Sequence, residues 1–332
     1  MLKKRPNKRL LVTGGAGFIG SAFIRTILSL PEGPELVVNL DALTYAADLT
    51  KLKSVESDQR YTFAAGDICN GALIEELVRR HQIDTIVHFA AETHVDRSID
   101  APRLFARTNI EGTLSLLEVT RRFPAIHFHH VSTDEVYGSY ASGHASEESP
   151  YAPNSPYAAS KAAADHLTRA YHRTYNLSVT LSQGSNTYGL GQHPEKFLPY
   201  MLERAMQGKP LPIYGKGINV RDWLAVEDHV AAIWQILERG TNGESYSIGG
   251  GQQRQNLELL EELFVILSRY TEKSPEYYRS LIEFVEDRPG HDLRYALNTE
   301  KIKRELGWTP TLSLAEGIEK LVLSKTGLVG VL

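Results

Sequence analysis

The chain has 332 residues, of which 42% are hydrophobic and 23% are charged, and its formal net charge is -4. That length allows a full α/β domain and a smaller second lobe. A chain without a basic excess is not expected to bind nucleic acid, and no apolar run approaches the roughly 20 residues of a membrane span. Cys69 is the only cysteine, which excludes an internal disulfide and favours a cytoplasmic location.

Short apolar runs alternate with helical patterns in the first half of the chain. The apolar runs predict buried strands at residues 10–12, 36–40, 85–89, 127–131 and 179–181. The patterns between them predict helices at residues 21–30, 72–81, 104–122 and 157–175. Strands that alternate with helices form βαβ units. We therefore expect an α/β fold with a Rossmann-type, doubly wound parallel sheet.

Beyond about residue 189 the pattern loosens, and prolines and glycines interrupt it. Helices are expected at residues 197–207, 226–239, 257–270 and 314–323. We predict a Rossmann domain at residues 1–188 and, at 189–332, a smaller C-terminal lobe that mainly covers a substrate. Later strands near 220–250, such as residues 245–248, could rejoin the sheet of the first domain.

A glycine-rich loop separates the first predicted strand from the first helix. It contains G-x-G-x-x-G at Gly15, Gly17 and Gly20, preceded by Gly14. Such glycines allow a tight turn and let backbone N–H groups approach a pyrophosphate at the helix N-terminus. Asp41 ends the next strand, where a carboxylate accepts hydrogen bonds from adenosine ribose hydroxyls and repels a 2′-phosphate. The loop and Asp41 together predict NAD rather than NADP.

Two further segments follow predicted strands on the same side of the sheet. Asp67 and Ile68 follow the segment between residues 40 and 85 where the third strand of the fold is expected, at the place where the adenine would lie, although Asp67 could equally cap the following helix. Ala90 and Ala91 come after the fourth strand. Their small side chains allow the chain to pass close to the cofactor.

A tyrosine and a lysine share one face of the helix predicted after Pro156. Tyr157 and Lys161 are four residues apart. An ammonium beside a phenol favours the phenolate and lowers the phenol pKa, so Tyr157 is expected to act as a base near neutral pH.

The triplet Thr133, Asp134 and Glu135 ends the fifth predicted strand. Ligands in such sheets bind beyond the carboxyl ends of the strands. A dehydrogenase or epimerase needs only the tyrosine, the lysine and a hydroxyl, so two extra carboxyl groups indicate further proton transfers. If both face one pocket, their repulsion raises one pKa and leaves one acid and one base.

These motifs and others resemble the extended short-chain dehydrogenase/reductase superfamily and, within it, the dTDP-glucose 4,6-dehydratases. The matching segments span nearly the whole chain: GGAGFIGSAFIR, DALTY, AAETHVDRSI, STDEVYG, SPYAASKAAADH, PEKFLP, LPIYGKGINVRDWLAVEDH and DRPGHDLRYAL. The resemblance implies conversion of dTDP-glucose to its 4-keto-6-deoxy product by C4 oxidation, water elimination across C5 and C6, and hydride return to C6. It also implies a homodimer.

The resemblance assigns a role to each catalytic candidate. Tyr157 would take the proton of the 4-hydroxyl, and Lys161 would tune Tyr157 and hold the nicotinamide ribose. Thr133 would hydrogen-bond the 4-oxygen. Glu135 would remove the C5 proton, and protonated Asp134 would donate to the departing 6-hydroxyl.

The binding residues follow from the same resemblance, which implies no metal. NAD would be held by Gly14, Gly17, Phe18, Ile19, Gly20, Asp41, Ala42, Leu43, Thr44, Asp67, Ile68, Phe89, Ala90, Ala91, Thr108, Tyr157, Lys161 and Thr187. The nucleotide sugar would be held by Thr93, Thr133, Asn186, Lys196, Phe197, Pro212, Ile213, Tyr214, Arg221, Asn256, Arg288 and His291. Gln183, Thr187 and Ala42 depart from the pattern that is usual in the family.

Two alternatives remain at this stage. One is a related nucleotide-sugar enzyme, either a UDP-sugar 4,6-dehydratase or a 4-epimerase. The Asp134–Glu135 pair argues against an epimerase but does not separate thymine from uracil. The other is a non-catalytic NAD-binding protein, against which the retained Tyr157 and Lys161 argue.

Overall fold

The computed structural model describes residue 5 and residues 7–326; the outer ends of both predicted domains lie outside the described residues. Its largest sheet has seven parallel strands in the order β10-β6-β5-β4-β1-β2-β3. The strands are β1 (Arg9–Thr13), β2 (Leu36–Asp41), β3 (Tyr61–Ala65), β4 (Thr85–His88), β5 (His127–Thr133), β6 (Ser178–Gly184) and β10 (Ser245–Ile248). The order 3-2-1-4-5-6 is that of a doubly wound sheet, so the expected fold class is confirmed.

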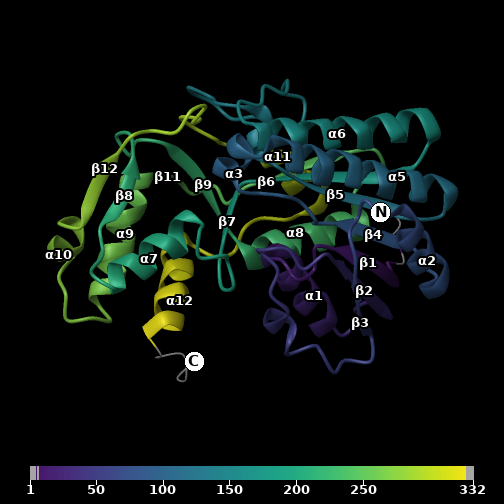
Figure 1. Ribbon diagram of the computed structural model, residues 1–332, viewed down its shortest axis with the longest axis horizontal. Coiled ribbons are helices and arrows are strands. Elements are labelled where there is room, and N and C mark those ends of the chain that lie inside the picture. The colour runs from purple at the N-terminus through teal and green to yellow at the C-terminus, as the bar shows by residue number, and fades with distance from the viewer. Residues whose placement is uncertain (1–4, 6, 327–332) are drawn as a thin grey trace.

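Helices cover both faces of this sheet (Figure 1). One face packs against α1 (Phe18–Ser29), α8 (Val226–Arg239) and α11 (Glu300–Leu306). The other packs against α2 (Gly71–His81), α5 (Thr113–Arg122) and α6 (Pro156–Tyr175). Leu10 and Val12 of β1 enter the first core and Leu11 enters the second, because successive strand side chains point to opposite faces. Covering both faces explains the nearly continuous apolar strands.

The single helix predicted over residues 104–122 is divided in the structure. It consists of α4 (Pro102–Phe105), a π-helical segment η2 (Ala106–Gly112) and α5. Asn109 of η2 donates to the backbone oxygen of Glu92 at 3.0 Å and to Ser160 Oγ at 2.8 Å. These buried hydrogen bonds hold the π-helical segment in place. Short π-helical segments are often found at functional sites.

Most of the second half of the chain forms a lobe beside the sheet. It contains a three-stranded sheet of β7 (Asn186–Tyr188), β9 (Val220–Ala225) and β11 (Gln253–Gln255), and a pair of β8 (Leu211–Tyr214) and β12 (Ile282–Val285). Its helices are α7 (Phe197–Met206), α9 (Asn256–Ser268), α10 (Pro275–Arg279) and α12 (Leu314–Thr326). A separate apolar core holds these elements together. Because β10 pairs with β6 and α8 covers the large sheet, the later part of the chain contributes to both units.

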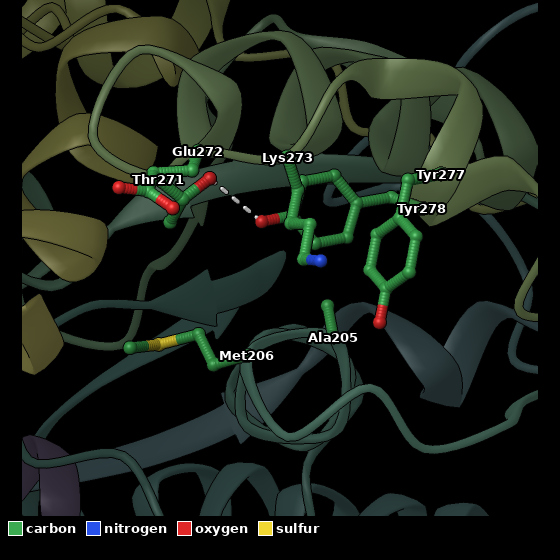
Figure 2. A pocket seen from close by; sticks show the side chains of 7 residues that line it. All are labelled: Ala205, Met206, Thr271, Glu272, Lys273, Tyr277 and Tyr278. Carbon is green, nitrogen blue, oxygen red and sulfur yellow. Dashed lines mark hydrogen bonds between the residues drawn. The ribbon is translucent and has the colours of Figure 1, made fainter.

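A small hollow of about 270 Å³ lies in this lobe between the end of α7 and the segment around α10 (Figure 2). Its lining includes Thr271 and Tyr278, whose hydroxyl groups are 2.8 Å apart. Across the described residues we find no helix that is long and apolar enough to cross a membrane, and no group of His, Cys, Asp and Glu side chains there suits a metal ion.

Buried histidines of the sheet should make the stability of the fold sensitive to acid. His129 is fully buried, with its ring nitrogens 2.9 Å from Thr180 Oγ1 and 3.1 Å from Ser182 Oγ. Burial lowers the pKa of His129 to about 3, whereas an unfolded histidine has a pKa of about 6.5. The neutral ring therefore stabilises the fold fully above about pH 6.5, and this contribution is lost as the pH falls toward the folded-state pKa.

We expect His129→Gln to flatten the pH dependence of stability. Between about pH 7 and about pH 4.5, the loss in free energy of unfolding should be smaller in the variant by roughly 2–3 kcal/mol. Denaturant titrations at several pH values measure this. His166→Gln, at an exposed position, is the control and should keep the wild-type slope. Parallel slopes for His129→Gln and the wild type would contradict the expectation.

Candidate active site

A groove of about 410 Å³ lies at the carboxyl ends of the central strands, between the large sheet and the lobe. Its floor contains the glycine loop after β1, and its walls come from η2, the start of α6 and the segment between β7 and α7. This is the position at which doubly wound sheets bind ligands. Every predicted cofactor residue except Leu43 lines the groove.

The glycine loop lies close to the chain after β4. Gly14 has φ +74°, and a Cβ atom there would lie 2.6 Å from the backbone nitrogen of Ala90. At Gly20 a Cβ atom would lie 2.3 Å from the oxygen of Gly14. Gly17 is the N-cap of α1 and offers no side-chain hydrogen bond, so the first N–H groups of this helix are left for a ligand.

Two backbone N–H groups hold the Asp41 carboxylate at the groove floor, one from the glycine loop and one from the segment after β2. Its Oδ2 accepts from Ala16 N at 2.8 Å, and its Oδ1 accepts from Leu43 N at 2.9 Å. The side chain of Leu43 is 44% exposed and does not line the groove. Leu43 therefore orients Asp41 through its backbone N–H, and its own contact with the cofactor stays a prediction.

The sequence left open whether Asp67 caps the helix that follows it, and in the structure Asp67 does not cap α2. The N-cap of α2 is Asn70, and Asp67 instead accepts from Cys69 N at 2.9 Å and from Arg107 at 2.9 Å. Arg107 and Thr108 both reach the groove from η2, so the π-helical turn shapes this wall.

These residues fit an NAD molecule. The loop at Gly17 leaves N–H groups uncapped beside open space, because a Cβ atom there would meet only the Gly14 oxygen within 4 Å. Asp41 stands at the end of β2, where a ribose carboxylate partner is needed. The glycine loop would hold the pyrophosphate, and Asp41 would hold the adenosine ribose.

The catalytic candidates meet at the other end of the groove. Thr133 ends β5, and Asp134 and Glu135 begin the 3-10 helix η3 (Asp134–Tyr137). The Thr133 hydroxyl donates to Asp134 Oδ1 at 3.3 Å and accepts from Glu135 N at 3.3 Å. Both carboxyl groups and Tyr157 line the same cavity. This meets the condition under which the two carboxyl groups could act as an acid and a base.

The two carboxyl groups differ in their electrostatic surroundings. Burial, together with Glu135 and Asp222, raises the pKa of Asp134 well above its usual range, and its Oδ2 has no hydrogen-bond partner among the described residues. Burial also raises the pKa of Glu135, but the cations Arg221, Arg288 and Lys196 oppose that effect. Asp134 is therefore suited to donate a proton, and Glu135 is suited to accept one.

The expected effect of Lys161 on Tyr157 differs in the structure. Lys161 Nζ donates to the Val131 backbone oxygen at 2.8 Å and lies 3.4 Å from His130 Nε2. Burial and the nearby Glu135 raise the pKa of Tyr157 above its usual value. The prediction of a lowered tyrosine pKa is therefore wrong, because the ammonium is bonded to β5 and the phenol is buried beside a carboxylate.

The predicted substrate residues fall into two groups. Thr93, Thr133, Asn186 and Lys196 line the groove, and Lys196 Nζ donates to the Thr93 backbone oxygen at 2.9 Å. The remaining residues lie in the lobe outside the groove lining: Phe197, Pro212, Ile213, Tyr214, Arg221, Asn256, Arg288 and His291. Ile213 is fully buried in the lobe core, so its side chain packs against the lobe and is not available to a nucleotide.

Several of the lobe residues nevertheless form one polar cluster. Arg288 donates to Asp96 Oδ1 at 2.9 Å, and Tyr214 OH lies 3.5 Å from Asp96 Oδ2. His291 lies 2.6 Å from Asp287. Arg221 donates to the Asp292 backbone oxygen at 3.0 Å. Since Arg221 and Arg288 both influence the Glu135 carboxyl, the cluster adjoins the catalytic end of the groove.

Sequence reasoning missed an ion-pair cluster at the groove wall. Glu195 lies 3.2 Å from Arg97 and 3.6 Å from His193 Nδ1. The Arg97 guanidinium lies 3.7 Å from the centre of the Tyr45 ring, which makes an edge contact with His193. Glu195 belongs to the PEKFLP segment, which was the available signal. His229 also lines the groove, with Nδ1 2.8 Å from Thr187 Oγ1.

Comparisons with known proteins agree with this arrangement. The model of the family described as GDP-mannose 4,6 dehydratase matches residues 11–321. A dTDP-glucose 4,6-dehydratase from Haemophilus influenzae is 47% identical over 327 residues, which cover 94% of this chain and 96% of that protein. The chain belongs to the dTDP-glucose 4,6-dehydratase family.

Solved structures extend the comparison to the fold. The dTDP-glucose 4,6-dehydratase DesIV from Streptomyces venezuelae, solved with NAD bound, has a TM-score of 0.90 at 46% identity, with 97% of each chain covered. The UDP-glucuronic acid 4-epimerase from Bacillus cereus, solved with UDP-glucuronic acid and NAD, has a TM-score of 0.87 at 28% identity, with 97% of this chain and 99% of that chain covered. Epimerases therefore share the dehydratase fold at lower sequence identity.

Proposed function

We propose that the chain is an NAD-dependent lyase that converts dTDP-glucose to dTDP-4-keto-6-deoxyglucose. The observation that carries this proposal is the presence of Asp134, Glu135 and Tyr157 around one cavity that also contains the glycine loop. Membership of the dehydratase family supports the same reaction. NAD, when bound, supplies an acceptor for the hydride of C4 and later donates it to C6.

The chain's own residues move the protons. Tyr157 takes the proton of the 4-hydroxyl, while the Thr133 hydroxyl hydrogen-bonds the 4-oxygen. The resulting ketone makes the C5 proton more acidic, and Glu135 removes it. Asp134, whose raised pKa keeps it protonated, donates to the departing 6-hydroxyl so that it leaves as water. Oxidation must come first, because the C5 proton is only weakly acidic without the ketone.

Binding of the nucleotide sugar is proposed to use both units of the fold. Lys196, Arg221 and Arg288 supply positive charge near Glu135, which suits a diphosphate. In this proposal residues 1–188 mainly hold NAD and residues 189–332 mainly hold the nucleotide sugar. We also propose a cytoplasmic homodimer. The single cysteine supports a reducing compartment, and the resemblance to the family supports the homodimer.

The product identifies the reaction directly. Purified holoenzyme is incubated with dTDP-glucose and, separately, with UDP-glucose, and NMR and mass spectrometry analyse each product. We expect dTDP-glucose to lose one water and gain a 4-keto group. Recovery of unchanged sugar, or of sugar inverted only at C4, would contradict the proposal and favour an inactive NAD-binding protein or an epimerase respectively. Preferential turnover of UDP-glucose would move the assignment to a UDP-sugar dehydratase.

Retention of NAD should depend on the cluster around Glu195. The cluster joins the segment after β2 to the segment before α7 across the groove. Glu195→Gln removes one charge at similar size, and we expect NAD to dissociate a few-fold faster, because a partly exposed ion pair contributes about 1 kcal/mol or less. The amount of NAD that stays with the protein after timed dilution and filtration measures the rate. Glu203→Gln, on α7 outside the groove lining, is the matched control. Equal rates for Glu195→Gln and the wild type would contradict the expectation.

A further inference from the structure

A buried chain of polar side chains begins at Lys161 and continues into the protein interior. His130 Nε2 lies 3.4 Å from Lys161 Nζ on one side and 3.2 Å from Asp165 Oδ1 on the other. Asp165 Oδ2 accepts from Tyr151 OH at 2.6 Å and from Gln183 Nε2 at 3.1 Å. Lys161 is 4% exposed, and His130 and Asp165 are fully buried. Asp165 does not line the groove.

One ring nitrogen of His130 therefore faces two different groups. Nε2 accepts a hydrogen bond from the Lys161 ammonium only when it carries no proton, and it donates to Asp165 only when it carries one. The other ring nitrogen, Nδ1, and Asp165 Oδ1 have no hydrogen-bond partner among the described residues, so the contact of Asp165 with Nε2 is a close approach of charge. The protonation of the ring is consequently linked to the charges of Lys161 and Asp165.

A buried ammonium requires a compensating negative charge. The titratable side chains around this site are His88 of β4, His130 of β5, Tyr137 of η3, Tyr151 of the loop before α6, and Tyr157, Asp165 and Arg169 of α6. Burial lowers the pKa of His130 to about 4, so the ring is neutral near pH 7. Burial raises the pKa of Asp165, but the His130 ring 3.2 Å away, the charge of Lys161 and the hydrogen bond from Tyr151 outweigh it and lower the value to about 2. Of these groups, Asp165 alone is anionic at neutral pH.

We propose that Asp165, acting across His130, is the buried counter-ion that keeps Lys161 cationic and fixes its ammonium at β5, within reach of the groove. Asp165 is thus a positioning residue rather than a catalytic residue. This role rests on the proposed function, in which the Lys161 ammonium lies at the groove and holds the nicotinamide ribose beside Tyr157.

The charge pairing predicts a direction for the pH profile. Burial lowers the pKa of Lys161 to about 8, and Asp165 opposes this effect. Activity requires the protonated ammonium, so it is lost as the pH rises through the pKa of Lys161. Removal of the Asp165 charge should lower that pKa further and move the alkaline limb of kcat to lower pH.

The test uses holoenzyme with lysine labelled at Cε with carbon-13, and Lys161→Met identifies the Lys161 signal. In Asp165→Asn we expect the pKa of Lys161 measured by NMR and the alkaline limb of kcat to move to lower pH together, by about one pH unit or more. One pH unit corresponds to a tenfold change in protonation. KM should change little. Tyr151→Phe is the matched control. It removes a hydrogen bond to Asp165 but keeps the charge, so neither titration should move to lower pH even if the melting temperature falls.

Two results would overturn the pairing: an unchanged Lys161 titration in folded Asp165→Asn, or an equal downward shift in Tyr151→Phe. If Asp165→Asn does not fold, Asp165→Ser removes the same charge with a smaller side chain. A wild type that leaves dTDP-glucose unchanged would contradict the proposed function. The NMR titration would still decide whether Asp165 sets the charge of Lys161.

Discussion

Glu135→Gln is expected to oxidise C4 of the bound sugar and then stop before water is lost. The amide keeps the size of the side chain but cannot accept the C5 proton, whereas Tyr157 and Thr133 are unchanged. Loss of a positioned base typically costs about 10²- to 10⁴-fold in rate, and we expect turnover to fall by that amount. Rapid mixing of holoenzyme with dTDP-glucose should show the absorbance of reduced nicotinamide rising and then persisting.

The control for this variant is Glu147→Gln. Glu147 lies outside the groove lining, where it accepts a hydrogen bond from Ser247 N at 2.7 Å. This variant should turn over like the wild type. If Glu135→Gln released the 4-keto-6-deoxy product at the wild-type rate, Glu135 would lose its assigned role and another base would be required.

Tyr157→Phe should block the reaction one step earlier, so that no reduced nicotinamide forms. The phenol oxygen is the group proposed to accept the 4-hydroxyl proton, and phenylalanine keeps the ring contact with Phe105, whose centroid lies 6.4 Å from that of Tyr157. We expect kcat to fall about 10²- to 10⁴-fold with little loss of nucleotide-sugar binding. Rapid mixing and equilibrium binding measure the two effects separately.

Tyr175→Phe provides the comparison within the same helix. Tyr175 ends α6 and is 47% exposed, so its hydroxyl should not affect the reaction. Appearance of reduced nicotinamide at the normal rate in Tyr157→Phe would show that another group takes the 4-hydroxyl proton. The two variants should therefore stop the reaction at different steps. Glu135→Gln stops it after oxidation of C4, and Tyr157→Phe stops it before that oxidation.

Local sequence signals were sufficient for the parts of the site that lie within one element. The glycine loop, Asp41 and the spacing of Tyr157 and Lys161 each depend on a single turn or helix, and the structure places all of them at one groove. The parallel, doubly wound sheet also followed from alternation of strand and helix. These features require no knowledge of distant contacts.

Contacts between distant segments account for what the sequence did not predict. The π-helical turn at residues 106–112 is held by bonds from Asn109 to the chain after β4 and to α6, which no local pattern reveals. The ammonium of Lys161 is bonded to β5, although spacing along the helix suggested Tyr157 as its partner. The Glu195 cluster likewise joins three segments.

The central claim is that one sugar is oxidised, dehydrated and reduced in a single groove. The most direct measurement uses dTDP-glucose labelled with deuterium at C4 and locates the label in the product by NMR and mass spectrometry. We expect the deuterium at C6 of the same molecule, because the hydride taken from C4 is stored and returned. Deuterium that stays at C4, or is lost to solvent while product forms, would contradict the account.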